Sequence, residues 1–173
     1  MKKQNVINLL AAGALVVALV FGVQSCKKDD PDPCQDTTCL NGGTCNDGTC
    51  TCPDGYNGAN CENEDREIFL GSYSVATGTI TCGVSGSSSI PAGTSVIVSD
   101  NSGGIKKIAI NIGGVLTVIA TIDGSSLTVD NQTIGGYVYS GTGSVTSNTL
   151  TLSLSEFDSS IPETCVYNIT STK

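Results

Sequence analysis

Cysteines are the residues of this 173-residue chain whose chemistry is easiest to specify, since there are nine of them and no histidine. In an oxidising compartment thiols pair as disulfides, and an odd number leaves one cysteine for another use. Six crowd into residues 34–61, Cys82 and Cys165 stand apart, and Cys26 follows a long apolar run. Each group therefore predicts a different chemistry.

Cys26 ends the sequence Val23-Gln24-Ser25-Cys26, which resembles a bacterial lipobox. The resemblance implies cleavage before Cys26 and attachment of acyl chains such as palmitate to its thiol and its new amino group. At about 0.8 kcal/mol per buried methylene, several chains anchor a protein stably. We therefore expect a lipoprotein of a bacterial outer membrane whose contact with the membrane is its N-terminal lipid. The alternative is that Cys26 joins a disulfide.

The residues before Cys26 are typical of an export signal. Lys2 and Lys3 precede an uncharged run over residues 9–23, which is shorter than the roughly 20 residues of a membrane span. We expect a signal peptide over residues 1–25, the alternative being a permanent anchor helix. Removal of its two lysines takes the net charge from −8 to −10, which argues against a nucleic-acid partner.

A charged tetrad, Lys27, Lys28, Asp29 and Asp30, follows the lipobox directly. It resembles the lysine-plus-acidic signal that follows the lipidated cysteine in surface-exported lipoproteins of Bacteroidetes. The resemblance implies display on the outer surface, with residues 26–33 as lipid anchor and tether. The alternative is an anchor that faces the periplasm.

The six clustered cysteines are separated by four, five, four, one and eight residues. Six cysteines allow 15 connectivities, and spacing alone does not choose among them. Together with Asn41-Gly42-Gly43-Thr44-Cys45, the pattern resembles the EGF-like module, here residues 34–61. The resemblance implies the bridges Cys34–Cys45, Cys39–Cys50 and Cys52–Cys61. So short a segment lacks a sufficient core, and each bridge contributes about 2–3 kcal/mol in the chain-entropy model.

Metal binding is the competing interpretation of this module. A zinc cluster is disfavoured because thiolate-rich zinc sites belong mainly to reducing compartments. Calcium-binding EGF modules place Glu or Gln next to the first cysteine, whereas Pro33 occupies that position here. Asp30 and Asp32 supply few of the roughly six to eight oxygens that calcium takes. We expect no metal and no other cofactor.

Catalytic groups are scarce in the rest of the chain. Without histidine, catalytic triads and the usual zinc catalysis lack their commonest member. Most of the later carboxylates neighbour turns, which is typical of solvated loop charges; they are Asp123, Asp130, Glu156, Asp158 and Glu163. The sequence therefore predicts a protein that is not an enzyme.

Tyr137 and Tyr139 are candidates for ligand contact. Side chains alternate along a strand, so that these two share one face. They would form either a stacking platform on an exposed patch or part of a core that otherwise lacks large aromatics. The second interpretation is the one we favour.

The C-terminal region is expected to be an antiparallel β domain over residues 68–173, after a charged linker over residues 62–67. Thr149 to Ser155 alternates hydroxyls with three leucines, and glycine and asparagine turns separate similar runs. About eight strands are predicted, near 68–75, 78–84, 95–98, 105–112, 115–122, 126–129, 136–145 with 149–157, and 164–170. The fold class is all-β, a meander closed as a barrel or folded as a sandwich, with no helix required.

Cys82 and Cys165 lie in the first part and the last strand of this region. In an exported protein they pair with each other or with another molecule. An internal bridge needs Cα atoms roughly 5–6 Å apart, and therefore adjacent first and last strands. The layout resembles the lipocalin-like β domains of surface lipoproteins.

Two functional hypotheses follow. The first is a non-catalytic surface protein for binding, adhesion or structure, with an unknown protein or glycan ligand and an EGF-like spacer or contact unit. The second is a lipocalin-like carrier whose barrel holds a small apolar ligand. They differ in whether the barrel is hollow.

Overall fold

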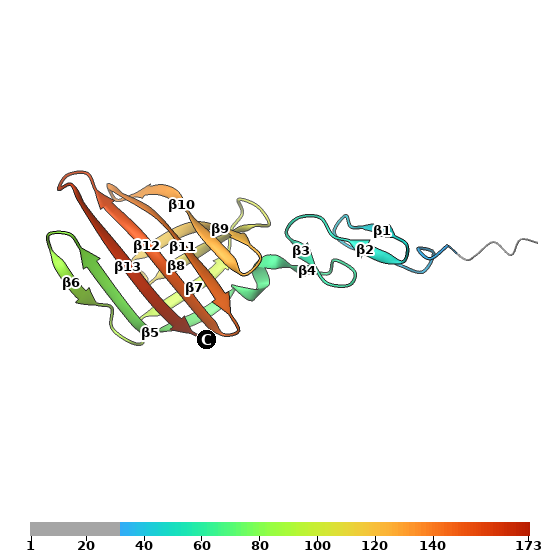
Figure 1. Ribbon diagram of the computed structural model, residues 1–173, viewed down its shortest axis with the longest axis horizontal. Helices are drawn as coiled ribbons and strands as arrows, with labels where there is room; N and C mark the ends of the chain where they lie inside the picture. Colours follow the sequence, from blue (N-terminus) through green and yellow to red (C-terminus); the bar gives the residue numbers. More distant parts are fainter. Residues whose placement is uncertain (1–31) are drawn as a thin grey trace, which may run out of the picture.

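The computed structural model describes residues 32–173, so that the expected signal peptide, Cys26 and the tetrad Lys27 to Asp30 lie outside the described residues. Figure 1 shows two units in succession, a small module and a larger β-barrel from one end of which the module projects. An EGF-like domain is thus followed by an eight-stranded antiparallel barrel.

The module consists of two short hairpins held by disulfides. Its strands are β1 (Thr44–Asn46), β2 (Thr49–Thr51), β3 (Tyr56–Asn57) and β4 (Asn63–Glu64). Asp47 and Gly48 have φ of 51° and 79°, as the two-residue type I′ turn between β1 and β2 requires. The bridges are those that the EGF-like resemblance implies, namely Cys34–Cys45, Cys39–Cys50 and Cys52–Cys61.

Residues 62–67, which the sequence suggests as a charged linker, are ordered and tied to both units. Asn63 and Glu64 form β4 and pair with β3, and the 3-10 helix η1 (Asp65–Ile68) follows at once. The β domain itself contains no α-helix among the described residues, in keeping with the expected all-β class, but Ile68 belongs to η1 rather than to the first strand. The turn of η1 delivers Phe69 into the barrel, where its side chain is fully buried.

The module also touches the barrel directly. Lys106 Nζ lies 2.9 Å from Asp54 Oδ1. A Cβ placed on Gly55 would lie 2.7 Å from Ile105 Cγ2, so that only glycine allows this approach. The Asp65 backbone N–H donates to the Gly55 carbonyl at 2.9 Å, which holds the start of η1 against the module.

The barrel contains eight strands and a short ninth. Its elements are β5 (Gly71–Cys82), β6 (Gly86–Ser89), β7 (Ser95–Asp100), β8 (Lys107–Ile112), β9 (Leu116–Asp123), β10 (Ser126–Ile134), β11 (Tyr137–Thr146), β12 (Thr149–Asp158) and β13 (Glu163–Thr172). All neighbours from β7 to β13 are antiparallel, and β5 pairs with both β7 and β13. This closes the barrel, with β6 added outside it as a hairpin on β5.

The largest differences from the expected strands concern β5 and β10. The strands expected near 68–75 and 78–84 are one strand, β5, which the sequence splits at Gly78. That glycine instead makes room for Ile90, whose Cβ would lie 2.7 Å from a Cβ at Gly78. β10 runs five residues past the expected end at Val129, to Ile134, because a bulge absorbs the polar residues before Gln132.

The barrel core follows from the alternation of side chains. In β12 the leucines 150, 152 and 154 point inward and are at most 3% exposed. A Cβ on Gly143 would lie 2.8 Å from Leu152 Cδ2, so that glycine in β11 gives the leucines their space. The other buried apolar side chains of the cluster are Phe69, Tyr73, Val75, Val96, Val98, Ile108, Ile110, Ile112, Val118, Ala120, Ile122, Leu127, Val129, Tyr139, Val145 and Ile169.

The seam between the first and last strands carries the fourth disulfide. Cys82 of β5 stands directly opposite Cys165 of β13, and their sulfurs are joined. The expected adjacency of the two strands is confirmed. Their Cα atoms are 4.1 Å apart, closer than the expected 5–6 Å, because a directly opposed cross-strand pair brings backbones nearer than most bridges do.

Candidate ligand-binding site

The two ends of the barrel differ. The end next to the module is covered by η1 and filled by Phe69, and the Tyr73 hydroxyl donates to the Phe69 carbonyl at 2.7 Å. The opposite end, which we call the distal end, is formed by the turns that join β5 to β6, β8 to β9, β10 to β11 and β12 to β13. A pocket of about 490 Å³ opens there, within the range of small-molecule sites.

The pocket exists because neighbouring strands separate toward the distal end. β10 pairs with β9 only over Ser126–Val129 and then diverges from it. The side chain of Gln132 spans the gap, since its Oε1 accepts from the Ile119 N–H at 3.0 Å and its Nε2 donates to the Ile119 carbonyl at 2.9 Å. One side-chain amide thus replaces a step of backbone pairing and holds the barrel open.

A second separation contributes the opposite wall. β5 pairs with β7 only over Gly71–Ser74 and then turns to pair with β6. The segment between β6 and β7 lies in the resulting space, where the Ile90 N–H donates to the Gly78 carbonyl at 2.9 Å. The apolar side chains that line the pocket are Ile80, Ile90, Pro91, Ile112, Val115, Leu116 and Ile134.

The polar part of the pocket comes from β11, β12 and β13. Tyr137, Tyr139 and Tyr167 line it together with Glu156. The Tyr167 hydroxyl donates to Glu156 Oε2 at 2.7 Å. Tyr139 is Glu156's direct cross-strand partner and is 7% exposed, whereas Tyr137 is 38% exposed near the mouth. Three tyrosines and one carboxylate therefore line one side of a largely apolar space.

The ionisation of Tyr139 and Tyr167 depends on their burial and on the nearby carboxylate of Glu156. Burial first, and then Glu156, raises the pKa values of Tyr139 and Tyr167 well above the usual value for tyrosine. Both phenols are therefore neutral at physiological pH and act as donors.

The two tyrosines singled out from the sequence thus have different positions on the same face. Tyr139 belongs to the buried core, as favoured, while Tyr137 remains half-exposed at the pocket. Of the two interpretations, the core therefore applies to Tyr139 and the exposed contact patch applies to Tyr137.

The other candidate acids lie elsewhere. The side chain of Asp123 is 95% exposed at the module end. Asp130 lies in the β10 bulge, where burial acts to raise its pKa but Lys107 and Thr121 outweigh this and lower it. Glu163 accepts from the N–H groups of Ser85 and Val84, which lower the pKa of that carboxyl. These contacts hold strands and turns together, and none of the three acids lines the pocket.

Glu156 and Tyr167 were not recognised as site residues from the sequence. The signal for Glu156 was present, because it continues the inward series of Leu150, Leu152 and Leu154 by one more step of two residues. A charged residue at an inward position near a strand end indicates a lined opening rather than a core. No local sequence pattern predicts that Tyr167 belongs to the site, since its pairing with Ile80 across the seam depends on closure of the barrel.

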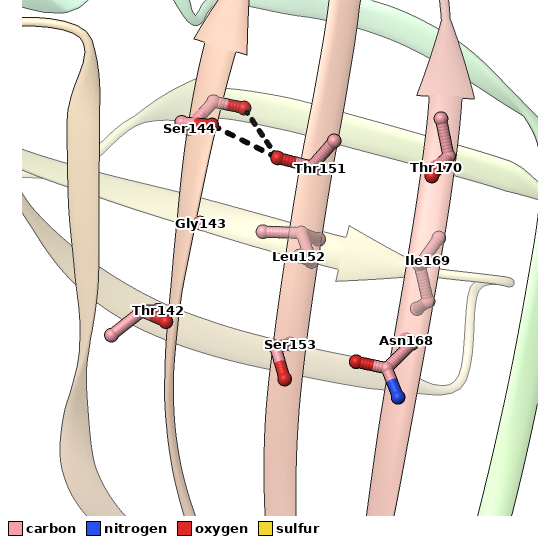
Figure 2. A pocket seen from close by; sticks show the side chains of 9 residues that line it. All are labelled: Thr142, Gly143, Ser144, Thr151, Leu152, Ser153, Asn168, Ile169 and Thr170. Carbon is pink, nitrogen blue, oxygen red and sulfur yellow. Dashed lines mark hydrogen bonds between the residues drawn. The ribbon is translucent and has the colours of Figure 1, made fainter.

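A shallower groove of about 360 Å³ lies on the outer face of β11, β12 and β13. Figure 2 shows its residues on three neighbouring strands, with Ser144 and Thr151 turned toward each other. Their hydroxyl oxygens are 2.9 Å apart. Asn168 adds an amide on β13, so that this face offers small polar groups and little apolar area.

Two further properties concern residues 32–173 as a whole. No group of three or more side chains of His, Cys, Asp or Glu is placed to hold a metal ion in this part of the chain. No helix among the same residues is long and apolar enough to cross a membrane.

Comparison with known proteins bears on the module alone. The family model for EGF-like domains matches residues 33–61. No solved structure matches the chain. The module is therefore recognised by sequence and disulfide pattern together, whereas the barrel and its pocket are described by their own geometry.

Proposed function

We propose that this chain is a lipid-anchored, non-catalytic binding protein of the bacterial cell surface, whose barrel holds a small, largely apolar ligand in the distal pocket. The observation that carries the proposal is the pocket itself, about 490 Å³ lined mainly by apolar side chains with a few convergent polar groups. That composition is typical of small-molecule sites. The barrel is filled elsewhere, so that the ligand enters from the distal end.

The module has the role of a spacer in this proposal. It adjoins the barrel at the end opposite the pocket, through η1 and the Lys106–Asp54 ion pair. An anchor at Cys26 would thus leave the pocket pointing away from the membrane. Lipidation at Cys26 and surface export through Lys27 to Asp30 are supported by the sequence motifs.

The ligand is tested by native mass spectrometry of the protein purified without detergent exchange. We expect a stoichiometric adduct on the parent protein and its loss in Ile134→Trp, which fills the pocket. Leu40→Trp is the control, because Leu40 is 45% exposed on the module. A parent spectrum without any adduct would count against the carrier function.

The anchor is tested separately. Metabolic labelling with palmitate is expected to mark the parent and not Cys26→Ser. Protease shaving of intact cells should release the parent but spare a variant with alanines at residues 27–30. Undiminished label in Cys26→Ser would contradict the lipoprotein assignment.

Adhesion through the outer face is the second candidate function. The hydroxyl and amide groups over β11, β12 and β13 favour it, since hydrogen-bonding side chains on a sheet suit a glycan or another polar partner (Figure 2). Binding on a glycan array that Thr151→Arg abolishes and Ile134→Trp leaves intact would select this function over the carrier.

A further inference from the structure

The charge distribution of the barrel is uneven along its axis. Within residues 32–173 the basic side chains are Arg66, Lys106, Lys107 and Lys173, and every one of them lies toward the module end. The distal end carries Glu156, Asp158 and Glu163 with no basic residue beside them. These three carboxylates without a neighbouring basic side chain make the field at the mouth of the pocket negative.

The carboxylate inside the pocket lacks a cation. Among the described residues Glu156 takes part in none of the ion pairs, and none of the residues lining the pocket is basic. Its protein partner is the neutral hydroxyl of Tyr167 at 2.7 Å. A carboxylate in partly apolar surroundings is stabilised further when a positive charge approaches it.

Three tyrosines line the same pocket as that carboxylate. Tyr137, Tyr139 and Tyr167 are three of the five tyrosines of the chain, and all three line this pocket. The faces of aromatic rings attract cations, and ligands with alkylated ammonium groups are typically held among several rings. The isoleucines and Leu116 on the other side suit the apolar body of such a ligand.

We propose that the distal pocket binds a free small-molecule organic cation, an alkylated ammonium group on an apolar body, with Glu156 as counter-ion and the three tyrosines as its cage. This proposal rests on the proposed function and specifies its ligand class. The ammonium lies between the tyrosine rings and Glu156, and the apolar body lies against the isoleucine wall.

A pair of isosteric probes tests the charge. Phenyltrimethylammonium and tert-butylbenzene have the same shape and differ in a positively charged nitrogen in place of carbon. Each probe is titrated into the intact protein, and binding is followed by the NMR shifts of the tyrosines. We expect the Kd of phenyltrimethylammonium to be at least tenfold lower than that of tert-butylbenzene. Equal affinity for the two probes, or no binding of the cation, would overturn the proposal.

Variants locate the interaction. Glu156→Gln should weaken the cation about tenfold and leave tert-butylbenzene unchanged, while Glu67→Gln, an exposed glutamate of η1 at the module end, should change neither. Tyr137→Leu should weaken the cation severalfold and Tyr137→Phe should not, because the ring provides the attraction. Tyr137 is half-exposed, so that its replacement leaves the core intact.

The outcomes separate this proposal from the proposed function. If both probes bind equally, the pocket holds an apolar ligand and only the cation assignment fails. If Glu156→Gln binds the cation as the parent does, the counter-ion assignment is wrong. Failure of the carrier function itself is detected by the missing adduct in the native mass spectrum, which does not depend on either probe.

Discussion

The module and the barrel reach a folded state by different means. In the module, Cys61 is the only apolar side chain among the described residues up to 64 that is fully buried, and three disulfides cross-link its segments. The barrel has an apolar core below its distal pocket and a single disulfide, at its seam. Covalent bridges therefore substitute for a core in the first unit and supplement one in the second.

The strongest test of this contrast removes one bridge from the module. Cys39→Ser/Cys50→Ser should unfold residues 34–61 as a unit, since loss of a disulfide from so small a domain costs about 2–5 kcal/mol. NMR spectra should show collapsed amide dispersion for the module and unchanged barrel signals. Retained dispersion in the module would show that it has a source of stability other than its bridges.

Removing the disulfide of the barrel should lower its stability considerably without unfolding it. Cys82→Ala/Cys165→Ala opens a loop with a sequence separation of 83 residues, worth about 4 kcal/mol in the chain-entropy model. We expect a lower free energy of unfolding in urea and an unchanged barrel fold. Collapse of the barrel at 25 °C would contradict the view that its core is sufficient.

Reducing the core should destabilise the barrel alone. Leu150 is fully buried among the inward residues of β12, and Leu150→Ala should lower the free energy of unfolding by about 3 kcal/mol. Thr151→Ala on the outward face of the same strand is the matched control. Urea titrations should show an earlier barrel transition, while the module's NMR signals keep their positions.

A small stabilisation is expected at Ser171. Its hydroxyl is fully buried without a hydrogen-bond partner among the described residues. Ser171→Ala removes an unsatisfied polar group and should raise the free energy of unfolding by about 1 kcal/mol. A decrease of similar size in thermal or urea unfolding would mean that the hydroxyl has a partner in solution.

The contrast also explains what the sequence could predict. The module's spacing of cysteines is a local pattern that resembles a known family, and it implied every bridge of the module. The alternation of Leu150, Leu152 and Leu154 predicted an inward face, and Cys82 with Cys165 predicted adjacent first and last strands. All these signals depend on near neighbours in sequence or on the number of cysteines.

The pocket depends on features that local patterns do not contain. Its opening follows from where β9 and β10 stop pairing and from the amide of Gln132, which resembles an ordinary surface residue in the sequence. The insertion of Ile90 opposite Gly78 joins residues from different elements. The alternation of side chains along β12 predicts that Glu156 points inward. The position of Tyr167 at the pocket follows only from the pairing of β13 with β5, which closes the barrel.

The disulfide at the seam also limits the length that the molecule reaches when a pulling force is applied to it. A force applied at Tyr167 is transmitted through two residues of β13 to Cys165, across the sulfurs to Cys82, and along β5 toward the module. The residues between the two cysteines, a separation of 83, lie outside this path. Extended, they would add roughly 290 Å of contour length. The disulfide therefore keeps the chain between the two cysteines from lengthening the molecule when force acts between Tyr167 and the module.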